Sequence, residues 1–202
     1  MSLKHSYSVL APIYDSVVAS ATRGMRHHSL QRLNPPLAGQ RILLAGIGTG
    51  LDIPFLPVGA NYTGLDLTRA MLKRARQLSR QRTDIQLHQG DVLSMPYAHE
   101  QFDIVILHLI LAVVPNPLLA LQEAARVLKP NGQILLLDKF LRQGQWAPLR
   151  RLLNTVVRHV ATRTDVVFED LLSQCPQLQV TDDQPAMAAG WFRQITLQKH
   201  TS

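Results

Sequence analysis

Apolar residues occur along this chain in short, nearly continuous blocks, and segments with helical spacing separate the blocks. Such blocks are typical of strands that are buried on both faces of a parallel sheet. They predict strands at 42–45, 62–66, 85–88, 102–111 and 134–137, the fourth ending near His108. Helical spacing predicts one helix from a cap at Thr68 to Arg80 and another over 117–128, which proline and glycine in 129–132 would end.

Shorter elements complete this alternation. They are helices over 6–33, divided near Pro12, and at 52–56, 145–160 and 167–174, with closing antiparallel strands at 177–181 and 191–198. The pattern predicts an α/β fold: a Rossmann-like, doubly wound, mostly parallel seven-stranded sheet with an antiparallel edge strand and helices on both faces. In the helix 68–80, the residues expected to face inward are Met71, Leu72, Ala75 and Leu78.

Three glycines at alternate positions directly follow the first predicted strand: Gly46, Gly48 and Gly50. Glycine allows a sharp turn and a close approach of a ligand to the backbone, and the amides that open the next helix face the same crevice. Asp66 ends the second strand about 20 residues later, where an acidic side chain meets ribose hydroxyls in doubly wound nucleotide-binding folds. Glycines in such turns also serve packing alone, but together with Asp66 they predict a nucleotide-type ligand.

The spacing of the glycines separates two classes of ligand. A dinucleotide fingerprint, G-x-G-x-x-G, needs a glycine at position 51, where this chain has Leu51. The pattern here is G-x-G-x-G, so the sequence disfavours an NAD-dependent oxidoreductase.

With these residues the chain resembles the class I S-adenosylmethionine-dependent methyltransferases. Five segments carry the resemblance, in the order that the family has them: 42–50, 64–67, 90–92, 101–105 and 128–132. The resemblance implies S-adenosylmethionine as the cofactor. One departure concerns Leu44, where many members carry an acidic residue that helps to hold the amino group of the cofactor's methionine part. A differently held cofactor is therefore one expectation.

The sequence shows no internal repeat and no second domain boundary. We therefore expect a single methyltransferase domain over 1–202, with a helical lid at 1–36, a cofactor-binding core at 40–139, and substrate-side helices with closing strands at 140–202.

The resemblance also implies roles for individual residues. Asp66 would accept hydrogen bonds from the ribose, Asp91 would bind the adenine amino group, and Val92 would meet the adenine ring edge. Leu67 and Met71 would pack on the adenine face. Asp91 has an alternative role as a turn-capping aspartate. The predicted cofactor-binding set is Tyr14, Gly46, Ile47, Gly48, Gly50, Asp66, Leu67, Met71, Asp91, Val92 and His108.

The predicted catalytic residues are Tyr14 and His108. Methyl transfer requires alignment of acceptor, methyl carbon and sulfur, and an amine acceptor must also lose a proton, for which histidine is the usual base near neutral pH. Tyr14 resembles the N-terminal tyrosine that related enzymes fold over the cofactor, and with His108 it could orient and deprotonate an amine. In the alternative, His108 only backs the adenosine and Tyr14 packs as a lid. The remaining histidines show no metal-ligand spacing with the carboxylates or Cys175, so no metal is predicted.

The resemblance implies a lipid or a small molecule as the methyl acceptor. Segments 47–54 and 110–117 are similar to soluble bacterial phospholipid N-methyltransferases, which act on phosphatidylethanolamine. They are also similar to ubiquinone/menaquinone-type C-methyltransferases, which commonly carry paired histidines where this chain has Ala112 and Val113. This difference favours a phospholipid headgroup, with a quinone precursor or a soluble small molecule as the alternative.

Composition adds a preference for anionic partners. The 21 Lys and Arg against 14 Asp and Glu give a net charge of +7, which attracts phosphates of lipid or nucleic acid. Basic helices at 23–32 and 145–158 would suit an anionic membrane, unless they are only solvated faces. A nucleic-acid-binding module is the distant alternative, because aromatic residues make up only 5% and no reader motif occurs. A single cysteine, no signal pattern and no apolar run of ~20 residues predict a cytoplasmic protein, with peripheral contact at the inner membrane surface left open.

Overall fold

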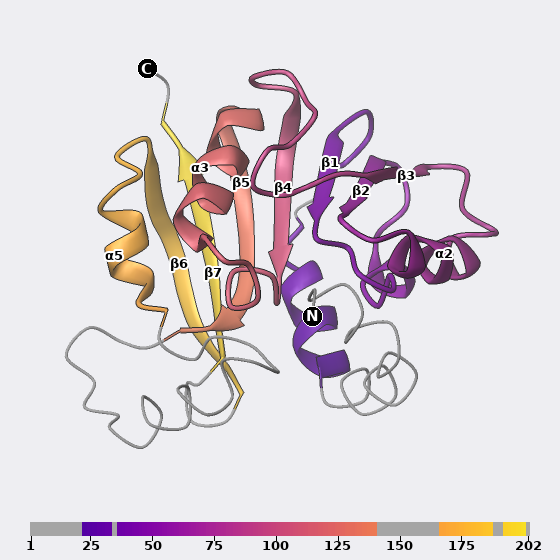
Figure 1. The fold of residues 1–202 in the computed structure, drawn as a ribbon, viewed down its shortest axis with the longest axis horizontal. Helices are drawn as coiled ribbons and strands as arrows, with labels where there is room; N and C mark the ends of the chain where they lie inside the picture. The colour runs from indigo at the N-terminus through magenta and orange to yellow at the C-terminus, as the bar shows by residue number, and fades with distance from the viewer. Residues whose placement is uncertain (1–21, 34–35, 141–165, 188–191, 201–202) are drawn as a thin grey trace.

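Seven strands form one mixed sheet in the computed structural model of the chain, which describes residues 22–33, 36–140, 166–187 and 192–200 (Figure 1). The strands are β1 (Arg41–Ala45), β2 (Asn61–Asp66), β3 (Ile85–Gln89), β4 (Phe102–His108), β5 (Leu128–Lys139), β6 (Leu178–Met187) and β7 (Phe192–Lys199). The helices are η1 (Ile53–Phe55), α2 (Arg69–Leu78), α3 (Pro117–Val127) and α5 (Phe168–Leu172), and residues 22–30 are also helical. The predicted helix at 145–160 and the first part of the predicted lid lie outside the described residues.

The strand order across the sheet is β3-β2-β1-β4-β5-β7-β6. The pairs from β3 to β5 are all parallel, whereas β7 is antiparallel to both of its neighbours, β5 and β6. The predicted α/β doubly wound, mostly parallel sheet is confirmed. Its antiparallel strand, β7, is the last but one in the strand order, with β6 outside it.

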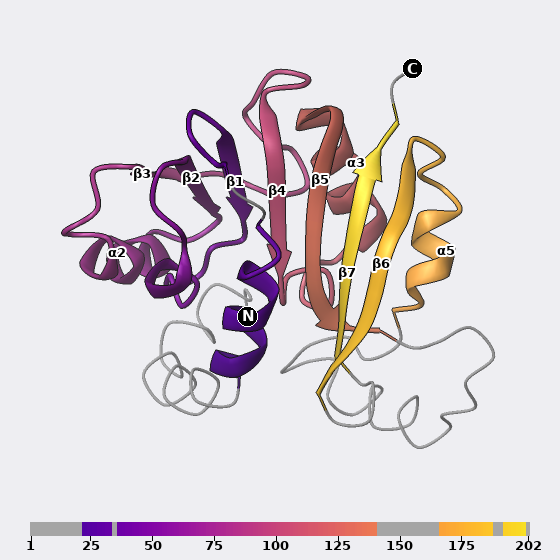
Figure 2. The same ribbon diagram turned by 180° about the vertical axis from the view of Figure 1, so that it is seen from behind.

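The central strands are apolar throughout because both faces of the sheet are covered. Leu43 and Ala45 pack in the core shared with α3 and α5, whereas Ile42 and Leu44 pack in the core shared with η1, α2 and the helical segment 22–30. Accordingly, α3 lies in front of the sheet in Figure 1 and behind it in Figure 2. The residues that follow β1 to β4 meet along one edge of the sheet, where ligands bind in folds of this class.

Helix α2 begins as predicted. The hydroxyl of Thr68 accepts a hydrogen bond from the Met71 amide at 3.4 Å, which satisfies one of the free amides at the start of the helix. Leu72 and Ala75 are buried, but Leu78, which was expected to face inward, is 47% exposed. The sheet ends at β3, so it offers no surface for the last turn of α2 to cover.

Strand β4 is shorter than the apolar block that predicts it. It ends at His108, because Leu109 adopts a left-handed backbone with φ of 57°, which cannot continue a strand. Non-glycine residues held in this region concentrate at functional sites. The apolar residues that follow, up to Leu111, belong to the turn after β4 and not to the strand.

Strands β5 and β6 are longer than predicted. Leu128 already pairs with Phe102, and after an irregular stretch the regular register starts where Gln133 pairs with Ile104. The proline and glycine of 129–132 therefore interrupt β5 and do not precede it. Strand β6 extends to Met187 because it follows β7 along its length, with two register shifts on the way.

Candidate active site

The turn from β1 to η1 contains three glycines with left-handed backbones, φ being 77° at Gly46, 59° at Gly48 and 87° at Gly50. The Gly46 amide donates to the Leu65 carbonyl at 2.8 Å, which ties the turn to β2. A Cβ at Gly48 would meet nothing within 4 Å, so the backbone here is open to a ligand. A Cβ at Gly50 would lie 2.9 Å from the Cα of Ala75, so this glycine lets α2 pack closely against the turn.

Asp66 lies at the end of β2 and faces the glycine turn. Its Oδ2 accepts from the Gly48 amide at 2.9 Å, and its Oδ1 accepts from the Thr68 amide at 2.9 Å and the Thr68 hydroxyl at 3.2 Å. Burial raises the pKa of this carboxyl above its ordinary value, against the lowering effect of these hydrogen bonds. A carboxylate offers about four lone-pair sites, so Asp66 keeps the capacity to accept from ligand hydroxyls.

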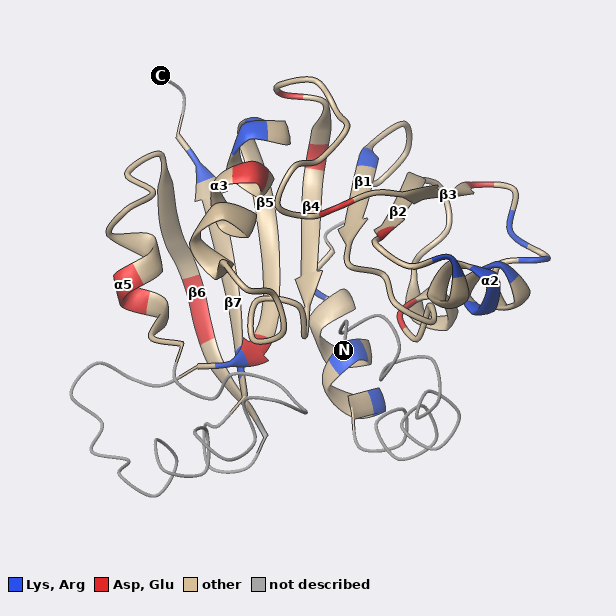
Figure 3. Cartoon of the chain, in the orientation of Figure 1, with Lys and Arg blue, Asp and Glu red and all other residues tan. Residues whose placement is uncertain are grey.

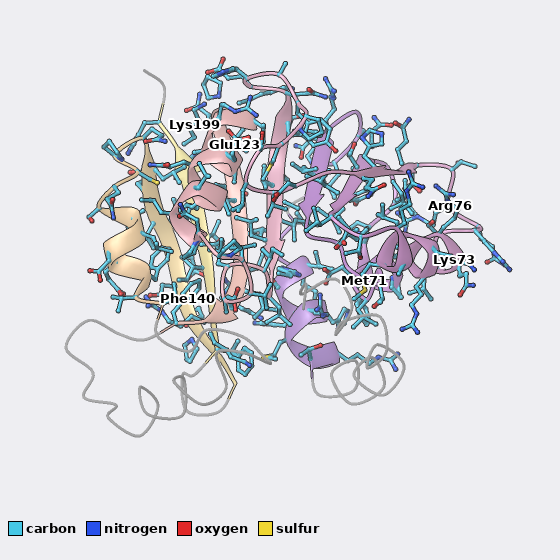
Figure 4. The ribbon with its side chains drawn as sticks, in the orientation of Figure 1. Met71, Lys73, Arg76, Glu123, Phe140 and Lys199 are labelled. Atoms are coloured by element: carbon cyan, nitrogen blue, oxygen red, sulfur yellow. The ribbon has the colours of Figure 1, made fainter. Side chains whose placement is uncertain are left out.

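Apolar side chains beside Asp66 reach the surface. Leu67 is 47% exposed, and Met71 is partly exposed at the start of α2. In Figure 4, Met71 lies on the side of α2 nearer the middle of the molecule, whereas Lys73 and Arg76 lie on its outer side. An exposed apolar pair next to a carboxylate suits a flat heterocycle attached to a sugar.

Asp91 and Val92 lie in the loop after β3. Asp91 caps its own turn, because its Oδ1 accepts from the Leu93 amide at 2.9 Å. Val92 is buried in the core, so only its backbone can face a ligand. Glu123 of α3, labelled in Figure 4, anchors this loop by accepting from the Met95 amide at 2.7 Å.

His108, at the end of β4, belongs to a buried polar chain that we define as Arg26, Ser29, Asp52 and His108. Its Nδ1 lies 3.0 Å from Asp52 Oδ1, and its Nε2 lies 3.0 Å from the Ser29 hydroxyl. The Arg26 guanidinium donates to Asp52 Oδ2 at 2.9 Å. Each of the four residues is buried, between 1% and 8% exposed. Both ring nitrogens of His108 thus have partners, and a proton from a substrate can reach the ring only through or past Ser29.

Asp52 is ionised within this chain. Burial alone would raise the pKa of its carboxyl, but the charges of His108 and Arg26 and their hydrogen bonds outweigh burial and hold that pKa well below its usual range. Asp52 also precedes η1 directly, two residues after Gly50. The polar chain therefore links the helical segment 22–30, the glycine turn and the end of β4.

Asp138, which the sequence analysis did not single out, is a second buried carboxyl at the same edge of the sheet. It lies near the end of β5, is 1% exposed, and accepts from the Lys139 amide at 2.8 Å and the Ala112 amide at 3.1 Å. Burial raises the pKa of Asp138 to about 6. Its hydrogen bond to Ala112 fixes the turn that follows β4.

The structure brings most of the predicted residues to one edge of the sheet. The glycine turn, Asp66, Asp91 and His108 all follow the ends of parallel strands there. Leu44, at the position where many members of the resembled family carry an acidic residue, is buried among apolar neighbours. Tyr14 lies outside the described residues. Within the described part of the chain, no group of three or more histidine, cysteine or acidic residues could hold a metal ion.

Residues 43–136, which contain the glycine turn, Asp66, Asp91 and His108, match the family model described as a methyltransferase domain. The chain is an S-adenosylmethionine-dependent methyltransferase. The methyltransferase is 27% identical over 191 residues to a phosphatidylethanolamine N-methyltransferase of Cereibacter sphaeroides, with 93% of each chain covered. It is 31% identical over 144 residues to the ubiquinone/menaquinone biosynthesis C-methyltransferase UbiE of Bdellovibrio bacteriovorus, covering 67% of this chain and 61% of that one.

The solved structures agree on the fold. The YcgJ protein from Bacillus subtilis superposes with a TM-score of 0.70 at 18% identity, covering 87% of this chain and 100% of the other. These residues also fit S-adenosylmethionine chemically: Gly48 leaves space that a Cβ would fill, and Asp66 offers an acceptor beside exposed apolar side chains. The cofactor supplies a methyl group on a positively charged sulfur.

Proposed function

We propose that this methyltransferase methylates the amine of a phospholipid headgroup, such as phosphatidylethanolamine, at an anionic membrane surface. The observation that carries the proposal is the relation to the Cereibacter sphaeroides phosphatidylethanolamine N-methyltransferase, which extends over 93% of both chains. A relation of that extent includes the segments outside residues 43–136, and function depends on such site-forming segments more than on the fold.

The charge distribution supports a membrane partner but moves the basic surface away from the predicted place. In the predicted basic helix 23–32, Arg26 is buried against Asp52, and Arg32 pairs with Asp182 at 2.8 Å. Arg23 remains exposed there, with its guanidinium over the ring of Phe55. The predicted helix at 145–158 lies outside the described residues.

Helix α2 and the turn that follows it carry the more extensive basic surface. Four basic residues at helical spacing are all exposed, and we call them the basic stripe: Arg69, Lys73, Arg76 and Arg80. No acidic residue occurs in α2, and Figure 3 shows Lys and Arg gathered on this helix while acidic residues lie on α5 and β6. An uncompensated stripe of this kind attracts anionic lipid headgroups, at about 1 kcal/mol per basic residue near the surface.

We also propose which residues hold the cofactor, from their positions in the site described above. The backbone of Gly46, Ile47, Gly48 and Gly50 would lie against the cofactor, Asp66 would bind the ribose, and Leu67 and Met71 would pack on the adenine. The Asp91 carboxylate and the Val92 backbone would meet the adenine edge. These side chains bind and orient; none of them needs to react.

The catalytic assignment of Tyr14 and His108 stays a prediction. His108 has both ring nitrogens occupied, so the Ser29 hydroxyl would have to leave Nε2 before the ring could take a proton from an amine. Tyr14 would close over the cofactor and orient the amine.

Methylation of a quinone precursor is the second candidate, with a soluble small molecule as a further form of it. The relation to the UbiE protein has the higher identity, 31%, although this chain spans only 61% of that protein. Carbon methylation would need no headgroup recognition and no anionic surface.

A labelled-methyl assay decides between these acceptors. Purified enzyme and S-adenosylmethionine carrying a labelled methyl group would be incubated with phosphatidylethanolamine vesicles containing anionic lipid, with demethylated quinones, and with water-soluble amines and phenols. We expect label in mono- or dimethylated phosphatidylethanolamine. Label in a quinone or a soluble product, with none in lipid, would overturn the proposal.

A further inference from the structure

The buried polar chain has the order of groups found in hydrolytic triads: the carboxylate of Asp52, the imidazole of His108 and the hydroxyl of Ser29. Two observations exclude a nucleophilic role. Ser29 is 1% exposed, which leaves no space for an acyl group at its oxygen, and the carboxylate also binds Arg26. The arrangement must therefore serve something other than hydrolysis.

Such an arrangement is costly to fold. Taking a carboxylate and a guanidinium out of water costs several kcal/mol per ion, and apolar residues of similar size often stabilise a core at least as well. Breaking one member typically costs about 3–5 kcal/mol, because the other charge is left buried. Stability alone therefore does not explain why this buried polar chain is present, whereas a need for one fixed geometry does.

The geometry fixes the protonation of the histidine ring. Asp52 is ionised and can only accept, so the Nδ1 of His108 carries the hydrogen that points at it. In the neutral ring, the Nε2 is then the acceptor for the Ser29 hydroxyl. Arg26 donates to the other oxygen of Asp52 and so holds this carboxylate in place. Asp52 thus determines the tautomer of His108.

The same contacts connect the glycine turn with the turn that follows β4, the two sides of the proposed cofactor site. Asp52 is two residues past Gly50, so its orientation is coupled to the glycine turn. His108 is followed by Leu109, whose left-handed backbone directs Ile110 to Gly46, where its Cδ1 would lie 2.6 Å from an added Cβ. A change in the polar chain would reach the cofactor from both sides.

We propose that Arg26, Ser29 and Asp52 are positioning residues for methyl transfer, which hold His108 in one tautomer and fasten the helical segment 22–30 to the glycine turn. The inference rests on the role proposed above for His108. It adds that His108 does not act alone: the segment 22–30 must be docked before the ring is correctly oriented.

The tautomer can be measured without any methyl acceptor. Enzyme labelled with ¹⁵N in its histidines would be examined by NMR, with the His108 signals identified by their loss in His108→Gln. We expect the neutral ring to carry its hydrogen on Nδ1 and none on Nε2, the reverse of the tautomer that free histidine prefers. A neutral ring with its hydrogen on Nε2, or averaging between the two tautomers, would overturn the inference. A wrong acceptor would not affect this result.

Kinetics test the positioning role with Asp52→Asn, which keeps the size of the side chain and removes its charge. We expect kcat to fall about 10- to 100-fold, at or below the lower end of the range for positioned acid–base groups, because the ring is no longer held by a charged acceptor. The matched control is Asp103→Asn, which removes an ion pair with Lys129 near the other end of β4. A kcat for Asp52→Asn equal to the values of the wild type and the control would overturn the inference.

A double substitution shows whether the residues act through one ring. Ser29→Ala and Asp52→Asn should together lower kcat by less than the product of their separate effects, because both act on His108. Multiplying effects would show that the two residues act independently and would contradict the inference. If Asp52→Asn fails to fold, the tautomer of the wild-type enzyme still decides the question.

Discussion

Replacing Gly48 with alanine should weaken cofactor binding while leaving the fold nearly intact. The added Cβ meets nothing within 4 Å, so the cost to stability is the left-handed backbone at φ of 59°, about 1–2 kcal/mol. That is a small part of the 5–15 kcal/mol typical of a native domain. The methyl group would nevertheless project into the space where we propose that the cofactor lies against the backbone. We expect the dissociation constant of S-adenosylmethionine to rise at least about tenfold, equivalent to about 1.4 kcal/mol.

Two other glycines make the comparison specific. Gly39→Ala is the matched control, because φ is 77° and an added Cβ again meets nothing, but the residue precedes β1 at the other edge of the sheet. Gly50→Ala should instead damage the fold: its Cβ would lie 2.9 Å from the Cα of Ala75, and overpacking adds about 1–3 kcal/mol to the backbone strain.

Isothermal titration calorimetry with S-adenosylmethionine and unfolding in urea would measure both quantities for each variant. Wild-type affinity in Gly48→Ala would show that the cofactor does not approach this turn. Equal losses of affinity in Gly39→Ala and Gly48→Ala would show that the effect is general strain and not contact.

Three further predictions concern charged groups. Asp66→Asn replaces an acceptor oxygen with a donor, so cofactor affinity should fall about tenfold or more by calorimetry; unchanged affinity would remove Asp66 from the site. The folded protein holds the Asp138 proton to about pH 6, whereas the unfolded chain releases it near 3.8, so stability should fall by about 3 kcal/mol as pH rises through this window. Urea unfolding across this range should show that fall in the wild type and not in Asp138→Asn; parallel curves would contradict it. The double variant Lys73→Gln, Arg76→Gln should sediment several-fold less with anionic vesicles, because it has lost two charges that attract the lipid. The control Lys129→Gln, at the other end of the strands, should sediment like the wild type. Equal sedimentation of the wild type, the double variant and the control would rule out the basic stripe.

The part of the fold around the glycine turn could be predicted because its signals are local. A buried strand followed by glycines needs only a few neighbouring residues to be recognised, and Thr68 marks the start of α2 by its own side chain. Asp66 could be predicted from its place at the end of the second strand, about 20 residues after the first glycine of the turn. These features depend on backbone geometry, which each residue type restricts directly.

The polar chain could not be predicted, because it depends on which face of a helix turns inward. Arg26 lies among basic residues, and such a segment is typical of a solvated face. In the structure it is buried with Ser29, one helical turn away, and both meet Asp52 and His108 from distant parts of the sequence. The only local signal was the spacing of Arg26 and Ser29 on the face that also carries Met25. Tertiary contacts decide such cases.

The irregular start of β5 shows a different limit. Lys129 to Gly132 has the composition of a turn, and Asn131 does adopt a left-handed backbone with φ of 60°. The chain nevertheless pairs with β4 on both sides of this stretch. Composition indicates a break in regular geometry but does not show whether pairing resumes on the same neighbour.

The position of β7 between β5 and β6 has a consequence for the order in which the sheet assembles. β6 precedes β7 in the chain, yet within the described residues its only strand partner is β7. The two strands should therefore form and open as one cooperative unit, with amide protons that exchange at a common rate. Opening this unit would leave the hydrogen-bonding edge of β5 bare along its leucines, 135–137, and bare edges of that kind recruit other chains. Variants that destabilise the last strand should thus be lost through self-association before they lose the cofactor.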